Sequence, residues 1–202
     1  MPRIAIIGGG IIGASAAHRL VRRGAEVLWI DRADPGQATA AGAGILPPSA
    51  HFSGGGALEA LTLAARRHYR ELLAELAADG EADTGYDVVG ALHVATSADE
   101  LERLAEVLED ARRKACAGLP HVGEVRELDG ARARELFPAL GELALGAVYM
   151  SGAARVDGRR LLAALRQAAL ARGAQAIAGS ARLELEAGAL RGVVVDGRRI
   201  PA

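Results

Sequence analysis

The sequence has little cysteine, few aromatic residues and no long apolar run. Its 202 residues contain one cysteine, Cys116, which excludes an internal disulfide framework and fits a reducing compartment, so we predict a cytoplasmic protein. No apolar stretch is long enough to cross a bilayer, and we expect no transmembrane segment. The net charge of −1 indicates neither nucleic acid nor an acidic membrane surface as a partner.

Candidate metal ligands are also sparse. Neither His51 nor His68 has a second ligand residue at metal-binding spacing. Cys116 lies in a charged helical stretch, where a passive thiol at or near the surface is expected. The sequence therefore predicts no metal site and no reactive cysteine.

What the sequence does contain is a strand–turn–helix–strand pattern in its first 31 residues. A short apolar, β-branched run over residues 3–7 predicts a strand buried on both faces. A helix is expected over residues 14–23, ended by Gly24 in a left-handed conformation. A second buried strand over residues 26–30 then ends in Asp31. This order of elements is typical of a dinucleotide-binding unit.

The turn between the first strand and the helix has the spacing G-x-G-x-x-G, formed by Gly8, Gly10 and Gly13. Gly8 allows a tight turn, Gly10 lets a pyrophosphate lie against the backbone, and Gly13 lets the helix pack closely on the strands. The N–H groups of the first helical turn then point at the phosphates. Asp31 stands where a carboxylate accepts hydrogen bonds from both ribose hydroxyls.

Two other interpretations of this segment stay open. Arg3, the apolar stretch and the small residues Ala14-Ser15-Ala16 imitate a cleaved signal peptide, although glycines disfavour the helix that such peptides form. A glycine-rich turn in some other α/β fold is the second alternative.

Residues 37–48 are a stretch of small residues that ends in two prolines. Such a backbone, with almost no side chains, can run flat against a large planar ligand. Because the stretch carries little charge and continues into Ile45 and Leu46, we expect it to be buried. A flexible linker is the alternative.

The glycine turn at residues 6–13, the strand that ends in an acid and the stretch from Thr39 to Leu46 together resemble the D-amino-acid oxidase superfamily of FAD enzymes, in its glycine oxidase-like branch. The resemblance implies FAD as the cofactor, with its ADP half on the first motif. The cofactor-binding residues that it implies are Gly8, Gly10, Ile11, Ile12, Gly13, Asp31, Arg32, Thr39, Ala40, Gly42, Ala43, Gly44, Ile45 and Arg182.

The resemblance also implies a role for each part of this set. The three glycines contact the pyrophosphate, Asp31 and Arg32 hold the ribose and the adenine, and the backbone of Arg182 approaches the adenine. The residues from Thr39 to Ile45 line the route to the isoalloxazine ring. No constellation of side chains indicates a catalytic acid or base.

The rest of the chain alternates helices with isolated strands, which favours a mixed sheet. Helices are expected over residues 57–79, from the capping box Ser97–Glu100 to about 117, and over 159–172 between Asp157 and Gly173. Asp129 is expected to cap a further short helix that Pro138 helps to end. Strands are expected over 86–95, 122–128, 146–150 and 174–178, with a hairpin at 181–186 and 190–196. In the first of these helices, Leu58 and Leu61 are expected on the buried side and Arg66 on the outside.

The predicted fold class is therefore α/β: a Rossmann-like domain that binds FAD or NAD(P), with part of a second, mixed α+β substrate domain. We expect residues 1–82 to form the first part of the FAD-binding domain, 83–150 a portion of the substrate domain, and 151–202 an incomplete return to the FAD-binding domain. The resemblance covers only about the first half of a family member, so we expect an N-terminal portion of a longer enzyme.

By resemblance, the expected function is FAD-dependent oxidation of glycine, D-amino acids or related amines by hydride transfer to flavin N5. The expected partner is a small amine or amino-acid substrate, and the oligomeric state is left open. Two alternatives also stay open: a nicotinamide-linked Rossmann dehydrogenase and a non-catalytic, truncated nucleotide-binding remnant.

Overall fold

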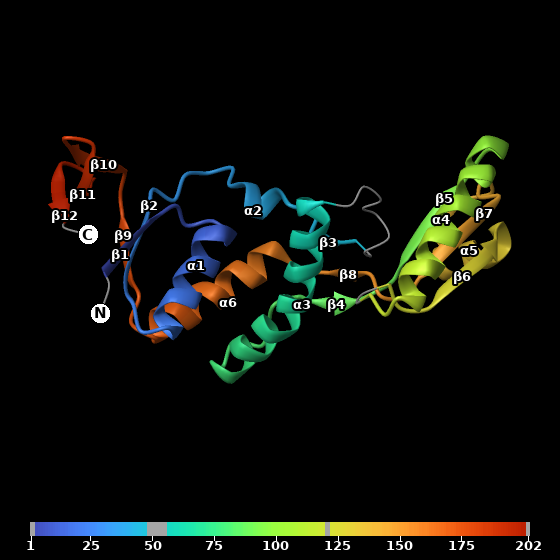
Figure 1. Ribbon diagram of the computed structural model, residues 1–202, viewed down its shortest axis with the longest axis horizontal. Helices are drawn as coiled ribbons and strands as arrows, with labels where there is room; N and C mark the ends of the chain where they lie inside the picture. Colours follow the sequence, from blue (N-terminus) through green and yellow to red (C-terminus); the bar gives the residue numbers. More distant parts are fainter. Residues whose placement is uncertain (1–2, 48–55, 120–121, 201–202) are drawn as a thin grey trace. The chain divides into compact units, whose positions relative to one another are not determined.

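The computed structural model describes residues 3–47, 56–119 and 122–200, and the chain divides into two compact units (Figure 1). Unit 1 comprises Met1–Ala43, Leu73–Gly85 and Asp157–Ala202; unit 2 comprises Gly44–Leu72 and Tyr86–Val156. Each unit has its own sheets and its own buried side chains. The assignment of residues 1–82, 83–150 and 151–202 to cofactor and substrate domains stays a prediction.

Unit 1 contains the predicted strand–turn–helix–strand pattern. Its parallel sheet has the order β1 (Arg3–Ile7), β2 (Glu26–Asp31), β9 (Gln175–Ala178). The four central residues of β2 are buried, as predicted. The prediction that β1 is buried on both faces is wrong: Ile7 is 47% exposed, because β1 lies at the edge of the described sheet and β2 at its centre.

Two helices of unit 1, α1 (Ile11–Arg22) and α6 (Gly158–Ala171), are in contact with each other (Figure 1). Both bury alanines, and small side chains let helix backbones approach closely. Gly24 and Gly173 follow the two helices with φ of +80° and +98°, which confirms both predicted helix ends.

The C-terminal strands of unit 1 form a separate antiparallel sheet: β10 (Ala181–Glu186), β11 (Ala189–Val195) and β12 (Arg198–Ile200). The predicted hairpin is therefore confirmed. Val193 and Val195 of β11 pack against Ile30 of β2 in one buried cluster. This cluster fixes the antiparallel sheet to the end of the parallel one.

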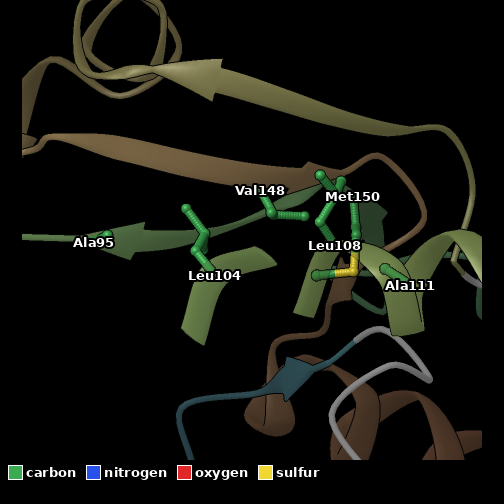
Figure 2. Close-up of a cluster of buried hydrophobic side chains, with 6 residues drawn as sticks. All are labelled: Ala95, Leu104, Leu108, Ala111, Val148 and Met150. Carbon is green, nitrogen blue, oxygen red and sulfur yellow. The ribbon is translucent and has the colours of Figure 1, made fainter. Parts of the chain in front are cut away.

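Unit 2 contains an antiparallel sheet in the order β5 (Ala91–Ala95), β7 (Gly146–Met150), β6 (Val125–Asp129). The helix α4 (Ala98–Cys116) packs on it through a buried apolar cluster (Figure 2). That cluster consists of Ala95, Leu104, Leu108, Ala111, Val148 and Met150. Unit 2 also contains the short helix α5 (Gly130–Leu136) and a 3-10 turn, Pro138–Leu140.

The predicted caps in unit 2 are confirmed. The Ser97 hydroxyl accepts a hydrogen bond from the Glu100 N–H at 3.3 Å, and the Glu100 carboxylate accepts one in return from the Thr96 N–H at 2.6 Å. The Asp129 carboxylate caps α5 by accepting from the Arg132 N–H at 2.8 Å.

The predicted strand over residues 86–95 is interrupted. It divides into β4 (Asp87–Val88) and β5, with Gly90 between them at φ +75°. A Cβ at Gly90 would lie 2.6 Å from the Tyr149 ring. β4 pairs with β8 (Ala154–Arg155), which also pairs with β3 (Ile45–Leu46).

The predicted helix over residues 57–79 forms as α3 (Ala57–Ala78), but the burial predicted for its first half is wrong. Leu58 and Leu61 are exposed and Arg66 is buried, whereas in the second half Leu76 is completely buried. Residues up to Leu72 belong to unit 2 and the rest of the helix to unit 1, so a single apolar stripe does not describe both halves. Within the described ranges, no helix is both long and apolar enough to cross a membrane.

Candidate cofactor site

The glycine turn of unit 1 has the tight geometry that its sequence predicted. Gly8 has φ +112°, and its N–H donates to the Ile30 carbonyl at 2.8 Å, which joins the turn to β2. A Cβ at Gly13 would lie 2.0 Å from the Gly8 carbonyl oxygen. Only glycine at position 13 therefore allows α1 to start so close to β1.

A tryptophan that the sequence analysis did not assign supports this turn. The Trp29 indole Nε1 donates to the Gly8 carbonyl oxygen at 3.0 Å, and the side chain is buried within β2. The Arg166 guanidinium of α6 lies over the indole ring, 5.5 Å from its centroid. Trp29 thus connects the glycine turn with both β2 and α6.

The N-terminus of α1 has no local cap. Its N-cap residue is Gly10, no side chain of the neighbouring sequence caps it, and no acidic residue lies in the first turn. By contrast, α4, α5 and α6 begin with Ser97, Asp129 and Asp157, whose side chains accept backbone N–H groups. The uncapped donors and the positive end of the helix dipole give α1 the properties of an anion site.

The Thr39 hydroxyl lies at this same helix end. Its Oγ1 accepts a hydrogen bond from the Ile11 N–H at 3.1 Å, and a Cβ at Gly10 would lie 3.4 Å from that oxygen. The structure therefore brings together the glycine turn, the first N–H of α1 and Thr39. Ile12, the next residue of α1, is exposed.

The Asp31 carboxylate lies against the glycine turn. A Cβ at Gly9 would be 2.4 Å from Asp31 Oδ2, so a larger residue at position 9 would displace the acid. Position 9 was not predicted as a site residue, because the motif leaves it unspecified. Arg32 forms an ion pair with the exposed Asp34, with 2.6 Å between Arg32 Nη2 and Asp34 Oδ2.

The stretch of small residues that follows differs from its prediction in two ways. Part of it is a helical turn, α2 (Ala38–Ala41), and most of it is exposed rather than buried. Ala40, Gly42 and Ala43 are all exposed, because no described side chain covers them. The Ala40 carbonyl accepts a hydrogen bond from the Arg159 Nη2 at 3.1 Å, a contact that no sequence pattern indicates.

Two of the predicted cofactor-binding residues, Gly44 and Ile45, belong to unit 2. Gly44 has φ +66°, and a Cβ there would lie 1.8 Å from the Val156 carbonyl oxygen. The Gly44 carbonyl accepts from the Val156 N–H at 2.9 Å, and Ile45 is 71% exposed in β3. Arg182 lies on β10 of unit 1, where its side chain is exposed.

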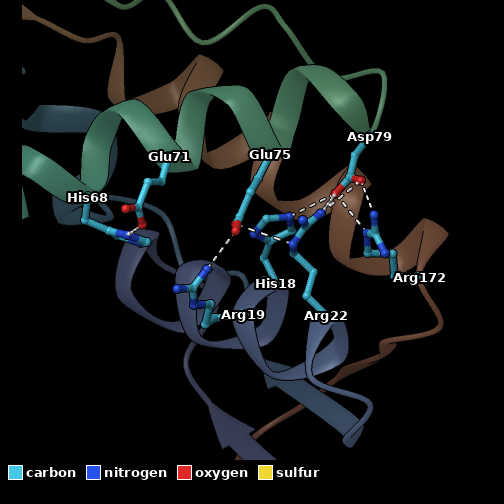
Figure 3. Close-up of polar contacts among 8 residues, drawn as sticks. All are labelled: His18, Arg19, Arg22, His68, Glu71, Glu75, Asp79 and Arg172. Atoms are coloured by element: carbon cyan, nitrogen blue, oxygen red, sulfur yellow. Dashed lines mark hydrogen bonds and ion pairs between the residues drawn. The ribbon is translucent and has the colours of Figure 1, made fainter.

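A charged cluster in unit 1 joins α1 to the end of α3 and to Arg172, the residue after α6 (Figure 3). Asp79, just after α3, receives His18 Nε2 of α1 at 3.0 Å and also pairs with Arg22 and Arg172. The hydrogen bond from Arg172, assisted by His18, holds the pKa of the Asp79 carboxyl far below its usual range against the opposing effect of burial. Glu75 adds an ion pair with Arg19 at 2.8 Å.

Unit 2 contains a cavity of about 300 Å³ whose surface is almost wholly apolar. The rings of Tyr69 and Tyr86 stack along it with centroids 6.0 Å apart, and burial raises the pKa of the Tyr69 hydroxyl. The lining comprises Leu46, Pro47, Leu61, Thr62, Ala65, Arg66, Tyr69, Tyr86 and Ala154. Such a surface suits an apolar group. Elsewhere in the described ranges, no three His, Cys, Asp or Glu side chains gather as metal ligands.

Residues 3–202 match the sequence profile of the DAO family, described as FAD dependent oxidoreductase. The uncharacterized oxidoreductase YurR of Bacillus subtilis (strain 168) is 40% identical over 197 residues, which cover 98% of this chain and 52% of that protein. The glycine oxidase of Geobacillus kaustophilus (strain HTA426) is 33% identical over 174 residues, which cover 85% of this chain and 44% of that protein.

Among solved structures, iminodiacetate oxidase from Chelativorans sp. BNC1 matches with a TM-score of 0.85 and 39% identity, over 98% of this chain and 52% of that one. This likeness confirms the predicted fold class. The chain spans about half the length of the curated relatives that it matches.

The geometry of unit 1 fits the family's cofactor. An uncapped helix N-terminus beside a glycine turn suits a pyrophosphate, and the carboxylate of Asp31 beside Gly9 suits a ribose. The match over nearly the whole chain favours FAD over the nicotinamide alternative. The chain belongs to the DAO family of FAD-dependent oxidoreductases.

Proposed function

We propose that the protein oxidises glycine, D-amino acids or related amines, with FAD as the electron acceptor. The observation that carries this proposal is the uncapped N-terminus of α1, enclosed by the glycine turn and by Thr39, in a chain that matches the family over residues 3–202. Because this chain spans about half the length of its relatives, the activity proposed is that of the whole protein.

In this proposal the residues of unit 1 bind and orient the dinucleotide. The backbone of Gly8, Gly10 and Gly13, the Ile11 N–H and the Thr39 hydroxyl hold the pyrophosphate, while Ile12 lies alongside. Asp31 accepts the ribose hydroxyls, and Arg32 and Arg182 lie by the adenine. The small residues Ala40, Gly42 and Ala43 let the backbone run beside the ring system. When bound, FAD supplies a hydride acceptor, N5, for the substrate Cα–H, and the imine that results is hydrolysed by water.

The substrate class is proposed from the relatives. The matching iminodiacetate oxidase is 39% identical and the matching glycine oxidase 33% identical. Iminodiacetate is a secondary amine that carries carboxymethyl groups, and glycine is the primary amine with one of them. Within this class, we therefore propose that the preferred substrate is an amine with a carboxymethyl group, oxidised at the carbon between nitrogen and carboxylate.

The test is made on the protein expressed from its complete gene. Its cofactor is released by denaturation and identified, and the holoprotein is mixed without oxygen with iminodiacetate, N-methylglycine, glycine or D-alanine. We expect FAD, and loss of the flavin's visible absorption with at least one of these amines. Secondary amines should yield an oxo acid and a primary amine, whereas primary amines should yield an oxo acid and ammonia.

Two outcomes would overturn the proposal. A protein that binds no flavin would exclude FAD chemistry, and one that holds FAD but is reduced by none of the four amines would support the non-catalytic alternative. After reduction, admission of oxygen separates an oxidase, whose flavin colour returns at once, from a dehydrogenase that needs an electron carrier.

A further inference from the structure

The first turn of α6 touches α2 at two adjacent points. The Arg159 guanidinium Nη2 donates to the Ala40 carbonyl at 3.1 Å. One residue earlier, the backbone of Gly158 is so close to α2 that a Cβ there would lie 2.7 Å from the Thr39 carbonyl oxygen. Both contacts lie inside unit 1 and join segments that are far apart in the sequence.

The start of α6 is itself firmly held. The Asp157 carboxylate accepts the N–H groups of Arg159 at 2.9 Å and Arg160 at 3.2 Å. Leu161 and Leu165 are buried one and two turns further along the helix. The Arg159 side chain therefore extends from a fixed base.

α2 has little to hold it in place on its own. It is a single turn of four residues, its N-cap Gln37 makes no side-chain cap, and none of its residues is buried. One turn of helix is not stable by itself, because nucleation costs more than one hydrogen bond returns. The position of α2 therefore depends on its contacts with α1 and α6.

The other contact of α2 leads to the cofactor site. Thr39, in the middle of α2, accepts the Ile11 N–H at the uncapped end of α1. A shift of α2 would move the Thr39 hydroxyl away from the glycine turn and displace the small residues that follow Ala40. α2 is thus held between the starts of two helices.

We propose that Arg159 is a positioning residue for FAD, which acts through the Ala40 carbonyl and without touching the cofactor. It holds α2 so that Thr39 and the residues after it meet the pyrophosphate and the ring system in one arrangement. This inference rests on the proposed FAD site and does not depend on which amine is oxidised. If the unchanged protein binds no FAD, the proposed function fails; if it binds FAD and the variants below do not differ, only this inference fails.

The test uses the protein from its complete gene, stripped of flavin and titrated with FAD. Arg159→Ala removes the donor, and we expect the dissociation constant for FAD to rise about fivefold. A change of this size is typical of the loss of one charge-assisted hydrogen bond that is partly open to solvent. Arg160→Ala is the matched control. It removes the same charge from the next residue, which pairs with Asp83 instead of α2, and we expect its FAD affinity to change less than twofold.

Three further measurements separate positioning from general stability. Arg159→Lys keeps a donor and a charge, so it should recover part of the affinity, and the flavin absorption bands of Arg159→Ala should shift relative to the unchanged protein. The melting temperature of the flavin-free Arg159→Ala protein should equal that of Arg160→Ala. Equal loss of FAD affinity in both alanine variants would assign the effect to charge alone, and unchanged affinity in Arg159→Ala would remove any positioning role; either result overturns the proposal.

Discussion

The indole Nε1 of Trp29 donates a hydrogen bond to the carbonyl oxygen of Gly8 at 3.0 Å. This bond connects the middle of β2 with the first glycine of the turn that follows β1. The same carbonyl lies where a Cβ at Gly13 would be, so one oxygen is enclosed by the indole and by the start of α1. The turn is thus held in place by side-chain chemistry as well as by its glycines.

Replacing Trp29 by phenylalanine tests this bond. A phenyl ring still fills part of the core but the donor is lost, so the half-buried Gly8 carbonyl loses this partner. We expect the free energy of unfolding to fall by about 1–3 kcal/mol in chemical denaturation, and FAD to bind more weakly. Arg166→Ala is the control, because it removes the cation over the ring but leaves the indole bond intact. Equal stability of Trp29→Phe and the unchanged protein would contradict this account.

Alanine at Gly13 and alanine at Gly10 should behave differently. At position 13 the Cβ would be 2.0 Å from a backbone oxygen, so α1 must move and the free energy of unfolding should fall by more than about 2 kcal/mol. At position 10 the nearest atom is the Thr39 hydroxyl at 3.4 Å, so the fold should tolerate alanine. FAD affinity should fall in both variants, because alanine at position 13 moves the turn and alanine at position 10 places a Cβ where the pyrophosphate approaches the backbone. If Gly13→Ala melts at the same temperature as Gly10→Ala, the close approach of α1 and β1 is wrong.

Removal of the Thr39 hydroxyl should weaken FAD binding without unfolding the protein. Thr39→Val keeps the shape of the side chain but gives the Ile11 N–H no acceptor. We expect about a tenfold weaker FAD affinity by titration, because one polar contact to the pyrophosphate is lost. Thr39→Ser should bind FAD nearly as well as threonine does. A valine variant with unchanged affinity would show that Thr39 only packs against the turn.

Asp79 makes stability depend on pH in a defined direction. The pKa of the Asp79 carboxyl is lowered in the folded protein, chiefly by the hydrogen bond from Arg172. The ionised carboxylate therefore stabilises the fold at pH values above the usual carboxyl pKa of about 4, and this stabilisation is lost as the pH falls towards the lowered pKa. Asp79→Asn should therefore cost about 3 kcal/mol of unfolding free energy at pH near 7, and the difference from the unchanged protein should shrink in acid.

The control for this prediction lies on α3. Glu71 pairs with His68 on the surface, and Glu71→Gln should change stability by less than about 0.5 kcal/mol at either pH. Denaturant titrations at neutral and acid pH measure both variants. A constant difference between Asp79→Asn and the unchanged protein across this range would contradict the assigned pKa shift.

Local patterns predicted most elements of the fold. The caps Ser97, Asp129 and Asp157 and the terminating glycines Gly24 and Gly173 act within one turn of their helices, so their effect can be deduced from neighbouring residues. Long-range placement was not deducible in this way. The exposure of Leu58 and the burial of Arg66 depend on which part of the chain meets each half of α3.

The candidate site shows the same division. The glycine motif specifies its three glycines through backbone geometry, but it says nothing of Gly9, whose missing side chain makes room for Asp31. The contacts of Trp29 with Gly8 and of Arg159 with Ala40 join residues 21 and 119 positions apart in the sequence. Side-chain donors at such separations leave no periodic signal, so only the folded arrangement shows them.

If the N-terminus of α1 and its glycine turn hold FAD, a bulky side chain above the turn must prevent FAD from binding. A titration with FAD measures this. Flavin-free protein from the complete gene is titrated with FAD beside its Gly10→Val variant, in which a branched side chain occupies the space above the turn. We expect stoichiometric, saturable binding by the unchanged protein and none by a folded Gly10→Val protein. Equal binding by the two proteins would contradict it, because the cofactor would then lie elsewhere.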